Sequence, residues 1–257
     1  MRIASLTCSN TEIVCALGLG AQLVGIDDHS DHPVCVVKDL PRLGPDLSID
    51  IDALEQLSPD IVLASLTVPG HEKVVAAISA RGMKYIAPDP RSLSDIFRDV
   101  MDIAQLLGVP TRGEALVGWM KKGLSSCTAE SRSLSVLVEW WPRPVYVPGE
   151  RSWVNQMLEL AGAVNPWHQE LAHSLEVSTE EAIEKDPAAV VISWCGIDPD
   201  RYQPAKVLSR EGWEQISAIR NQRVFCIPEA YLGRPGPRVV DGVRRLRSVV
   251  ETVAREP

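Results

Sequence analysis

The chain has 257 residues, enough for one large domain or for two lobes that each bury a hydrophobic core without disulfides. Hydrophobic residues make up 45% of the sequence and charged residues 23%, a composition typical of globular proteins. The net charge of -8 argues against a nucleic acid or an anionic membrane surface as partner. No apolar run reaches the roughly 18 residues that a membrane-spanning helix needs, so we expect no membrane-embedded segment.

The first half of the sequence alternates short strands with helices. We expect strands at residues 2–6, 24–27, 60–65 and 83–89, and helices at residues 12–17, 52–57 and 70–80. The first strand runs almost directly into the first helix, for which Ser9 or Asn10 is a suitable N-cap. This alternation predicts an α/β fold with a parallel-rich sheet covered by helices.

The alternation stops after residue 91, and apolar side chains then recur at helical spacing over residues 92–132, interrupted only by Gly108 and Pro110. Such a segment is long for a helix of a globular domain, and we interpret it as one backbone helix that joins two lobes. The predicted domains are therefore an N-terminal α/β lobe at residues 1–90, a spine helix at residues 91–133 and a C-terminal α/β lobe at residues 134–257.

The second half repeats the plan of the first. We expect strands at residues 134–141, 188–194 and 223–228, and helices at residues 152–161, at residues 179–185 and from residue 238 onward. The stretches LEQLSPDIVLAS (54–65) and AIEKDPAAVVIS (182–193) both read as a short helix, a proline and a buried strand with a small polar end. Two versions of one unit on a common helix predict a ligand cleft between the lobes.

Aromatic residues gather in the second half, in loops that follow the predicted strands. Ligands of open α/β sheets bind beyond the carboxyl ends of parallel strands, where the sequence places Trp141, Tyr146, Trp194 and Tyr231. Flat aromatic faces favour a large, partly apolar ligand. Because strand-end aromatics also pack into cores, core packing stays open for the tryptophans.

Two further features are chemically distinctive. His29 and His32 stand three residues apart in an acidic loop, which suits one imidazole for the axial position of a metal chelate; no third ligand accompanies them, so we predict no bare zinc site. Cys8 follows the first strand at the start of a helix, where a thiol is either reactive or simply packed. The six cysteines lack a C-x-x-C pair, which is typical of free thiols in a reducing compartment.

Several long stretches resemble the substrate-binding proteins of cobalamin and ferric-siderophore ABC importers. They include RIASLTCSNTEIVCALGLGAQLVGIDDHSDHP, LEQLSPDIVLAS, GHEKVVAAISARGMKYI and SWVNQMLELAGAVN, and the opening stretch lies nearest the cobalamin-binding branch. The resemblance covers nearly the whole chain. It implies a class III fold of two α/β lobes on one backbone helix, and a non-enzymatic, monomeric protein that captures a corrinoid, without a cofactor of its own, for an ABC importer permease.

The resemblance also implies roles for single residues. Glu72 in GHEK and Glu180 in VSTEE match glutamates that dock on arginines of the permease. His32 takes the place of a ligand-facing aromatic, and we expect it to stack on the corrin or coordinate cobalt opposite Trp194. Cys8 stands where the family usually has proline and is expected to line the cleft.

Two alternative functions stay open. One is the binding of haem or a ferric siderophore, although an anionic siderophore needs cationic partners and only Arg143, Arg151 and Arg234 lie in the predicted loops. The other is a cytosolic corrinoid- or tetrapyrrole-handling enzyme that uses the histidine loop with Cys8 or Cys195. The family resemblance implies an extracytoplasmic location, whereas the strand-like residues 2–6 do not resemble a signal peptide and leave a cytoplasmic one open.

Overall fold

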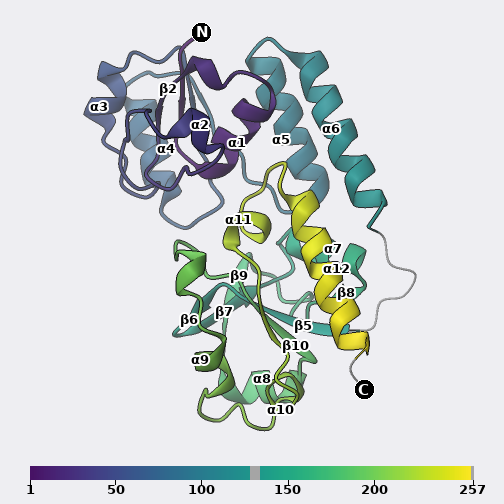
Figure 1. The fold of residues 1–257 in the computed structure, drawn as a ribbon. Coiled ribbons are helices and arrows are strands. Elements are labelled where there is room, and N and C mark those ends of the chain that lie inside the picture. Colours follow the sequence, from purple (N-terminus) through teal and green to yellow (C-terminus); the bar gives the residue numbers. More distant parts are fainter. Residues whose placement is uncertain (128–133, 256–257) are drawn as a thin grey trace. The chain divides into compact units, whose positions relative to one another are not determined.

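The computed structural model describes residues 1–127 and 134–255. The chain forms two compact units, the first from Met1–Pro90 with Ser94–Trp119 and the second from Arg91–Leu93 with Met120–Pro257. Each unit contains a four-stranded parallel sheet (Figure 1). The predicted boundaries of the functional domains at residues 90 and 133 remain predictions, and the second of them lies outside the described residues.

The sheet of the first unit has the strand order β2-β1-β3-β4. Its strands are β1 (Ile3–Ser5), β2 (Leu23–Ile26), β3 (Ile61–Leu63) and β4 (Tyr85–Ile86), and its flanking helices are α1 (Cys8–Ala16), α2 (Val34–Val37), α3 (Ile51–Gln56) and α4 (His71–Ala80). Every residue of β1 and β3 is buried, as expected for central strands that helices cover on both faces.

The larger sheet of the second unit has the order β11-β10-β5-β8. Its strands are β5 (Leu134–Glu139), β8 (Ala163–Val164), β10 (Ala189–Ile192) and β11 (Val224–Cys226). If the strands of each sheet are numbered along the chain, both sheets have the order 2-1-3-4. The internal repeat read from the sequence is therefore present in the topology.

Local geometry at the two repeated stretches agrees as well. The side chain of Asp50 caps α3, and Ser178 caps α8 (Thr179–Lys185) through a capping box with Glu181. Ser58 and Asp186, each directly before a proline, have positive φ angles of 45° and 39°. Each short helix thus begins at a polar cap and ends in a left-handed residue before its buried strand.

The second unit carries further elements. A small antiparallel sheet consists of β6 (Trp141–Pro142), β7 (Val145–Pro148) and β9 (Ser174–Val177). The remaining helices are α7 (Val154–Ala161), α9 (Pro204–Leu208), α10 (Ser217–Arg220), α11 (Glu229–Leu232) and α12 (Val239–Arg255), with 3-10 turns at Gly20–Gln22 in the first unit and Pro199–Arg201 in the second. No helix among the described residues is both long enough and apolar enough to cross a bilayer.

The prediction of one spine helix is wrong. The segment forms two helices, α5 (Leu93–Leu106) and α6 (Pro110–Ser125), which lie side by side (Figure 1). Gly108 has a φ of 74°, and the N–H groups of Gly108 and Val109 donate to the carbonyls of Gln105 and Ala104. This Schellman motif ends α5, and Pro110 begins α6. The expected end of the helix near residue 132 lies outside the described residues.

The predicted N-cap of the first helix is also wrong. Helix α1 begins at Cys8, and Thr7 takes the N-cap position. The Asn10 side chain points instead to the neighbouring strand end, where its Nδ2 donates to the carbonyl of Ala64 at 2.7 Å. The polar residues at this junction therefore tie α1 to the strand ends rather than cap the helix.

Candidate functional site

The carboxyl ends of β1 and β3 are the topological switch point of the first unit, because the chain leaves these neighbouring strands toward opposite edges of the sheet. A buried polar group lies there, which we call the first strand-end cluster: Ser5, Thr11, Asp27 and Ser30. The Thr11 hydroxyl is 2.9 Å from Ser5 Oγ and 2.8 Å from Ser30 Oγ, and Ser30 in turn donates to Asp27. The hydroxyls form one continuous network that ends on a carboxyl group.

Asp27 is the only acid of this cluster and is fully buried. Burial raises its pKa, although the hydrogen bonds from Ser30 and from the His29 backbone N–H oppose the rise. Cys8, partly exposed at the first turn of α1, lies with its Sγ 3.9 Å from Asp27 Oδ2. The structure thus places Cys8 beside the cluster, at the junction where the sequence predicted a ligand wall.

The two histidines of the acidic loop differ in their surroundings. His32 is exposed, whereas His29 Nε2 approaches Asp46 Oδ1 at 4.0 Å. His71, which the sequence analysis did not single out, is buried and places its Nε2 3.1 Å from Asp46 Oδ2. Its Nδ1 accepts a hydrogen bond from the Val68 N–H, so Nε2 carries the proton toward Asp46.

Asp46 therefore lies between two imidazoles. Burial alone raises its pKa, but the hydrogen bond from His71 and the electrostatic interactions with His71 and His29 hold the pKa below its ordinary value. Among the described residues, no group of three or more His, Cys, Asp or Glu side chains has the arrangement of a metal site.

The second unit has its switch point between β5 and β10. The second strand-end cluster consists of Glu139, Trp194, Tyr202 and Arg210. Glu139 has no exposed surface and accepts hydrogen bonds from Trp194 Nε1 at 2.8 Å and from both terminal nitrogens of Arg210 at 2.7 and 2.9 Å. This cluster is a closed polar core rather than an open set of binding groups.

Trp194 belongs to this core. Only 5% of its surface is exposed, its indole N–H is already used, and its ring meets that of Tyr202 edge-on at 5.5 Å. Of the two roles that the sequence left open for this tryptophan, the geometry favours core packing.

Trp141 and Tyr146 form an aromatic pair on the small antiparallel sheet. They are opposite each other in the β6–β7 ladder, so their side chains stand on one face. Trp141 is 42% exposed and Tyr146 is partly exposed. Unlike Trp194, this pair presents aromatic surface on which a flat ligand can stack.

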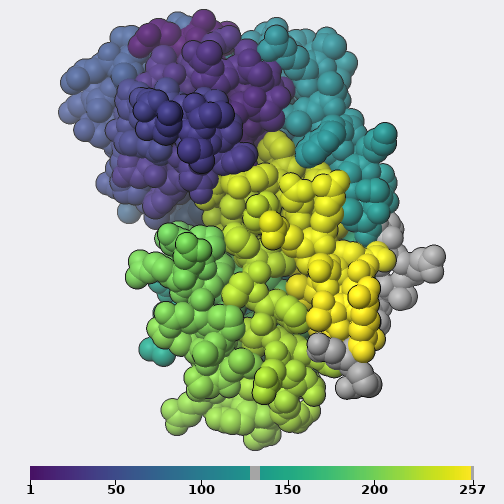
Figure 2. Space-filling model, viewed as in Figure 1, coloured from purple at the N-terminus to yellow at the C-terminus, as the bar shows by residue number. Residues whose placement is uncertain are grey.

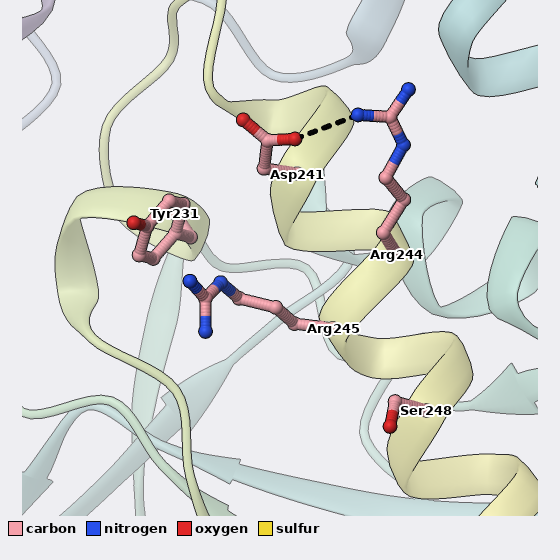
Figure 3. Close-up of a pocket in the computed structure, with 5 residues that line it drawn as sticks. All are labelled: Tyr231, Asp241, Arg244, Arg245 and Ser248. Atoms are coloured by element: carbon pink, nitrogen blue, oxygen red, sulfur yellow. Dashed lines mark hydrogen bonds and ion pairs between the residues drawn. The ribbon is translucent and has the colours of Figure 1, made fainter.

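Tyr231 lies in α11, where its ring packs against the guanidinium groups of Arg245 at 4.1 Å and Arg238 at 5.4 Å. The ring also lines a pocket with residues of α12 (Figure 3). The Tyr231 ring thus makes cation–π contacts with two arginines of its own unit.

The two glutamates expected to dock a partner are both exposed in the first turn of a helix. Glu72 is the second residue of α4 and accepts a hydrogen bond from the Gly70 N–H at 2.8 Å, and Glu180 is the second residue of α8. The pKa of Glu72 is lowered by hydrogen bonds from nearby backbone N–H groups. Their exposure agrees with a docking role, which remains a prediction.

Residues 3–231 match the model of the family described as periplasmic binding protein. The chain belongs to the periplasmic binding protein family. It is 28% identical to the uncharacterized ABC transporter substrate-binding lipoprotein YvrC of Bacillus subtilis, over 95% of this chain and 78% of that protein. It is 22% identical to the vitamin B12-binding protein of Vibrio cholerae, over 99% of this chain and 91% of that one.

A solved structure shares the fold of this periplasmic binding protein. The haem-binding protein RhuT of Roseiflexus sp. RS-1 superposes with a TM-score of 0.85 at 25% identity, covering 98% of each chain. The α/β fold class and the family predicted from the sequence are confirmed.

Sequence reasoning missed the groups that organise both strand-end clusters, namely Asp27, Ser30, Glu139 and Arg210. For Asp27 and Glu139 a signal exists, because each is a charged residue at the end of a buried apolar strand. For Arg210 no local signal exists, since it reaches Glu139 from 71 residues further along the chain.

Proposed function

We propose that the chain is the substrate-binding protein of an ABC importer and captures a corrinoid. The relatives described above supply the class of function, since one is a substrate-binding lipoprotein of an ABC transporter and another binds vitamin B12. The proposal further places the protein outside the cytoplasm, as a monomer that performs no catalysis.

One observation carries the choice of a largely neutral ligand. Three arginines at the strand ends are committed to partners in their own unit: Arg42 donates to the carbonyls of Asp27 and Ser30, Arg210 binds Glu139, and Arg234 binds Glu229 at 3.2 Å. Of the other arginines that the sequence placed in these loops, Arg143 and Arg151 are exposed. An anionic siderophore or a haem with free carboxylates needs cations that are available for pairing. A corrinoid with amide side chains needs hydrogen-bonding partners rather than cations.

The proposed ligand contacts follow from exposure. Trp141 and Tyr146 provide a stacking surface, Cys8 lies beside the first strand-end cluster, and the exposed imidazole of His32 stacks on the corrin or coordinates cobalt. The rings of Trp194 and Tyr231 are occupied by protein contacts, so in this proposal they shape the site without stacking on the ligand. Glu72 and Glu180 dock on the permease.

Haem is the second candidate, favoured by the similarity to RhuT. Isothermal titration calorimetry of the purified protein with cyanocobalamin, haem and a ferric hydroxamate separates the three ligand classes. We expect binding of cyanocobalamin alone, weakened about tenfold or more by Trp141→Ala, because stacking on one exposed aromatic is worth roughly 1–2 kcal/mol. Trp119→Ala, at a tryptophan that is 50% exposed on α6, is the matched control. Tight haem binding without cyanocobalamin binding would overturn the corrinoid assignment.

The same titration tests His32. If its imidazole coordinates cobalt, His32→Ala weakens aquocobalamin binding more than cyanocobalamin binding, because cyanide already holds the axial position tightly. Equal losses leave stacking as the role of His32, and no loss for either form removes this residue from the site.

A further inference from the structure

Four polar residues of α12 share one face of the helix. Asp241, Arg244, Arg245 and Ser248 follow the spacing i, i+3, i+4 and i+7, which places their side chains on neighbouring turns of the same side. Together with Tyr231 of α11 they line a surface pocket of about 330 Å³ (Figure 3). The C-terminal end of the chain that contains α12, drawn in yellow, is exposed on the face that Figure 2 shows.

The pocket has an excess of positive charge in a chain whose net charge is -8. Arg244 pairs with Asp241 at 2.8 Å, whereas Arg245 has no carboxylate partner among residues 1–127 and 134–255. The guanidinium of Arg245 instead lies 4.1 Å from the centre of the Tyr231 ring. In the same described part of the chain, the Ser248 hydroxyl has no protein hydrogen-bond partner. One cation and one hydroxyl group are therefore available to a ligand.

The wall of the pocket is held in place. Gly242 lets α11 approach α12 so closely that a Cβ atom at this position would lie 2.2 Å from the carbonyl oxygen of Tyr231. The next residue of α11, Leu232, accepts a hydrogen bond from the buried indole of Trp153 at 2.8 Å. The backbone of Tyr231 is thus held in place, which fixes the position from which its ring projects. Because Arg245 stacks on this ring, its side chain loses less conformational freedom on ligand binding than an unsupported arginine would.

We propose that this α11–α12 pocket binds a phosphate group. The planar guanidinium of Arg245 presents paired N–H donors that match two oxygens of a tetrahedral oxyanion, Ser248 donates to a third, and Arg244 adds charge. The volume exceeds that of inorganic phosphate and leaves room for the organic part of a phosphate monoester. The ligand is therefore either free phosphate or a small phosphate ester.

Nuclear magnetic resonance of the ¹⁵N-labelled full chain tests the proposal. Amide signals of α12 and the Nε–Hε signal of Arg245 are followed during titration with sodium phosphate or glycerol 3-phosphate, with sodium chloride of equal ionic strength as reference. We expect saturable shifts confined to α11 and α12. Tighter binding of the ester identifies an ester as the ligand, and equal binding identifies free phosphate.

Arg245→Gln should weaken phosphate binding about tenfold or more, and Ser248→Ala should weaken it less. Arg98→Gln is the matched control, because Arg98 also pairs with an aspartate three residues before it but lies outside the pocket. Circular dichroism melting checks that each variant folds. Shifts that chloride reproduces, or that Arg245→Gln leaves unchanged, overturn the proposal.

Discussion

Arg210 and Glu139 form a bidentate ion pair at the end of β5, with Nη1 2.7 Å from Oε2 and Nη2 2.9 Å from Oε1. Trp194 donates a third hydrogen bond to the same carboxylate. Because Glu139 is fully buried, these donors take the place of water around its carboxylate. The pair therefore joins β5, the loop after β10 and the chain after α9 at the switch point of the second unit.

Removal of one partner should destabilise the protein strongly. Arg210→Met leaves a buried carboxylate without its cation, and we expect the free energy of unfolding to fall by about 3 kcal/mol. Urea denaturation followed by tryptophan fluorescence measures this change, since six of the seven tryptophans lie in the second unit. Arg98→Met, at an exposed ion pair, should have far less effect. A similar small loss for both variants would show that the buried pair does not hold this region.

Asp46 should stabilise the first unit in a pH-dependent way. Its pKa is lower in the folded protein, so its contribution is present above the unfolded pKa of about 4 and is lost as the pH falls below that value. We expect Asp46→Asn to cost on the order of 1 kcal/mol at pH 7 and much less at pH 3. Asp39→Asn, at a carboxylate that is 85% exposed, is the control. A pH-independent loss would contradict the ionic role of Asp46.

The contribution of Asp99 on α5 to stability should depend on pH in the opposite direction from that of Asp46. Burial and the neighbouring Asp102 and Asp95 raise its pKa to about 7, and its Oδ2 has no hydrogen-bond partner among the described residues. The stabilising contribution of the protonated form is complete below the unfolded pKa of about 4 and is lost as the pH rises through 7.

Asp99→Asn should therefore raise the stability relative to the unsubstituted protein more at pH 8 than at pH 4. The gain should be about 1 kcal/mol, a small value because the side chain is partly exposed and solvent screens its charge. Thermal unfolding of both proteins across this range measures the difference. A constant difference between the two melting curves would mean that Asp99 is ionised in the folded protein at all these pH values.

The docking role of Glu72 and Glu180 predicts a loss of transport without a loss of binding. Glu72→Ala and Glu180→Ala should each lower uptake of labelled cyanocobalamin about tenfold in cells that carry the cognate importer, because each removes a partner of a permease arginine. Affinity for the ligand, measured on the purified variants, should stay unchanged. Glu184→Ala, at an exposed glutamate of the same helix α8, is the control. Normal uptake by the double variant would remove both residues from the interface.

Much of the fold could be predicted from local patterns. The buried strands, the repeat around Pro59 and Pro187 and the parallel sheets follow from runs of apolar residues between helix signals. The break between α5 and α6 could also be predicted, because Gly108 followed by Pro110 is a strong signal for the end of one helix and the start of the next. The apolar periodicity on both sides outweighed this signal and led to the wrong prediction of one helix.

The candidate site was less accessible to sequence reasoning. Trp141 and Trp194 are both tryptophans at strand ends, yet one is 42% and the other 5% exposed. The difference depends on Glu139 and Tyr202, which reach Trp194 from distant positions in the chain. Likewise, His71 draws Asp46 into an interaction that no spacing in the sequence indicates. Local patterns find the strand ends, but long-range contacts decide which side chains remain available there.

Gel filtration of the purified chain mixed with excess cyanocobalamin measures corrinoid capture without a label or a partner protein. We expect corrin absorbance to elute with the protein at one ligand per chain, and excess haem not to displace it. Elution of all the corrin absorbance in the small-molecule fraction, with haem retained on the protein instead, would show that the ligand is not a corrinoid.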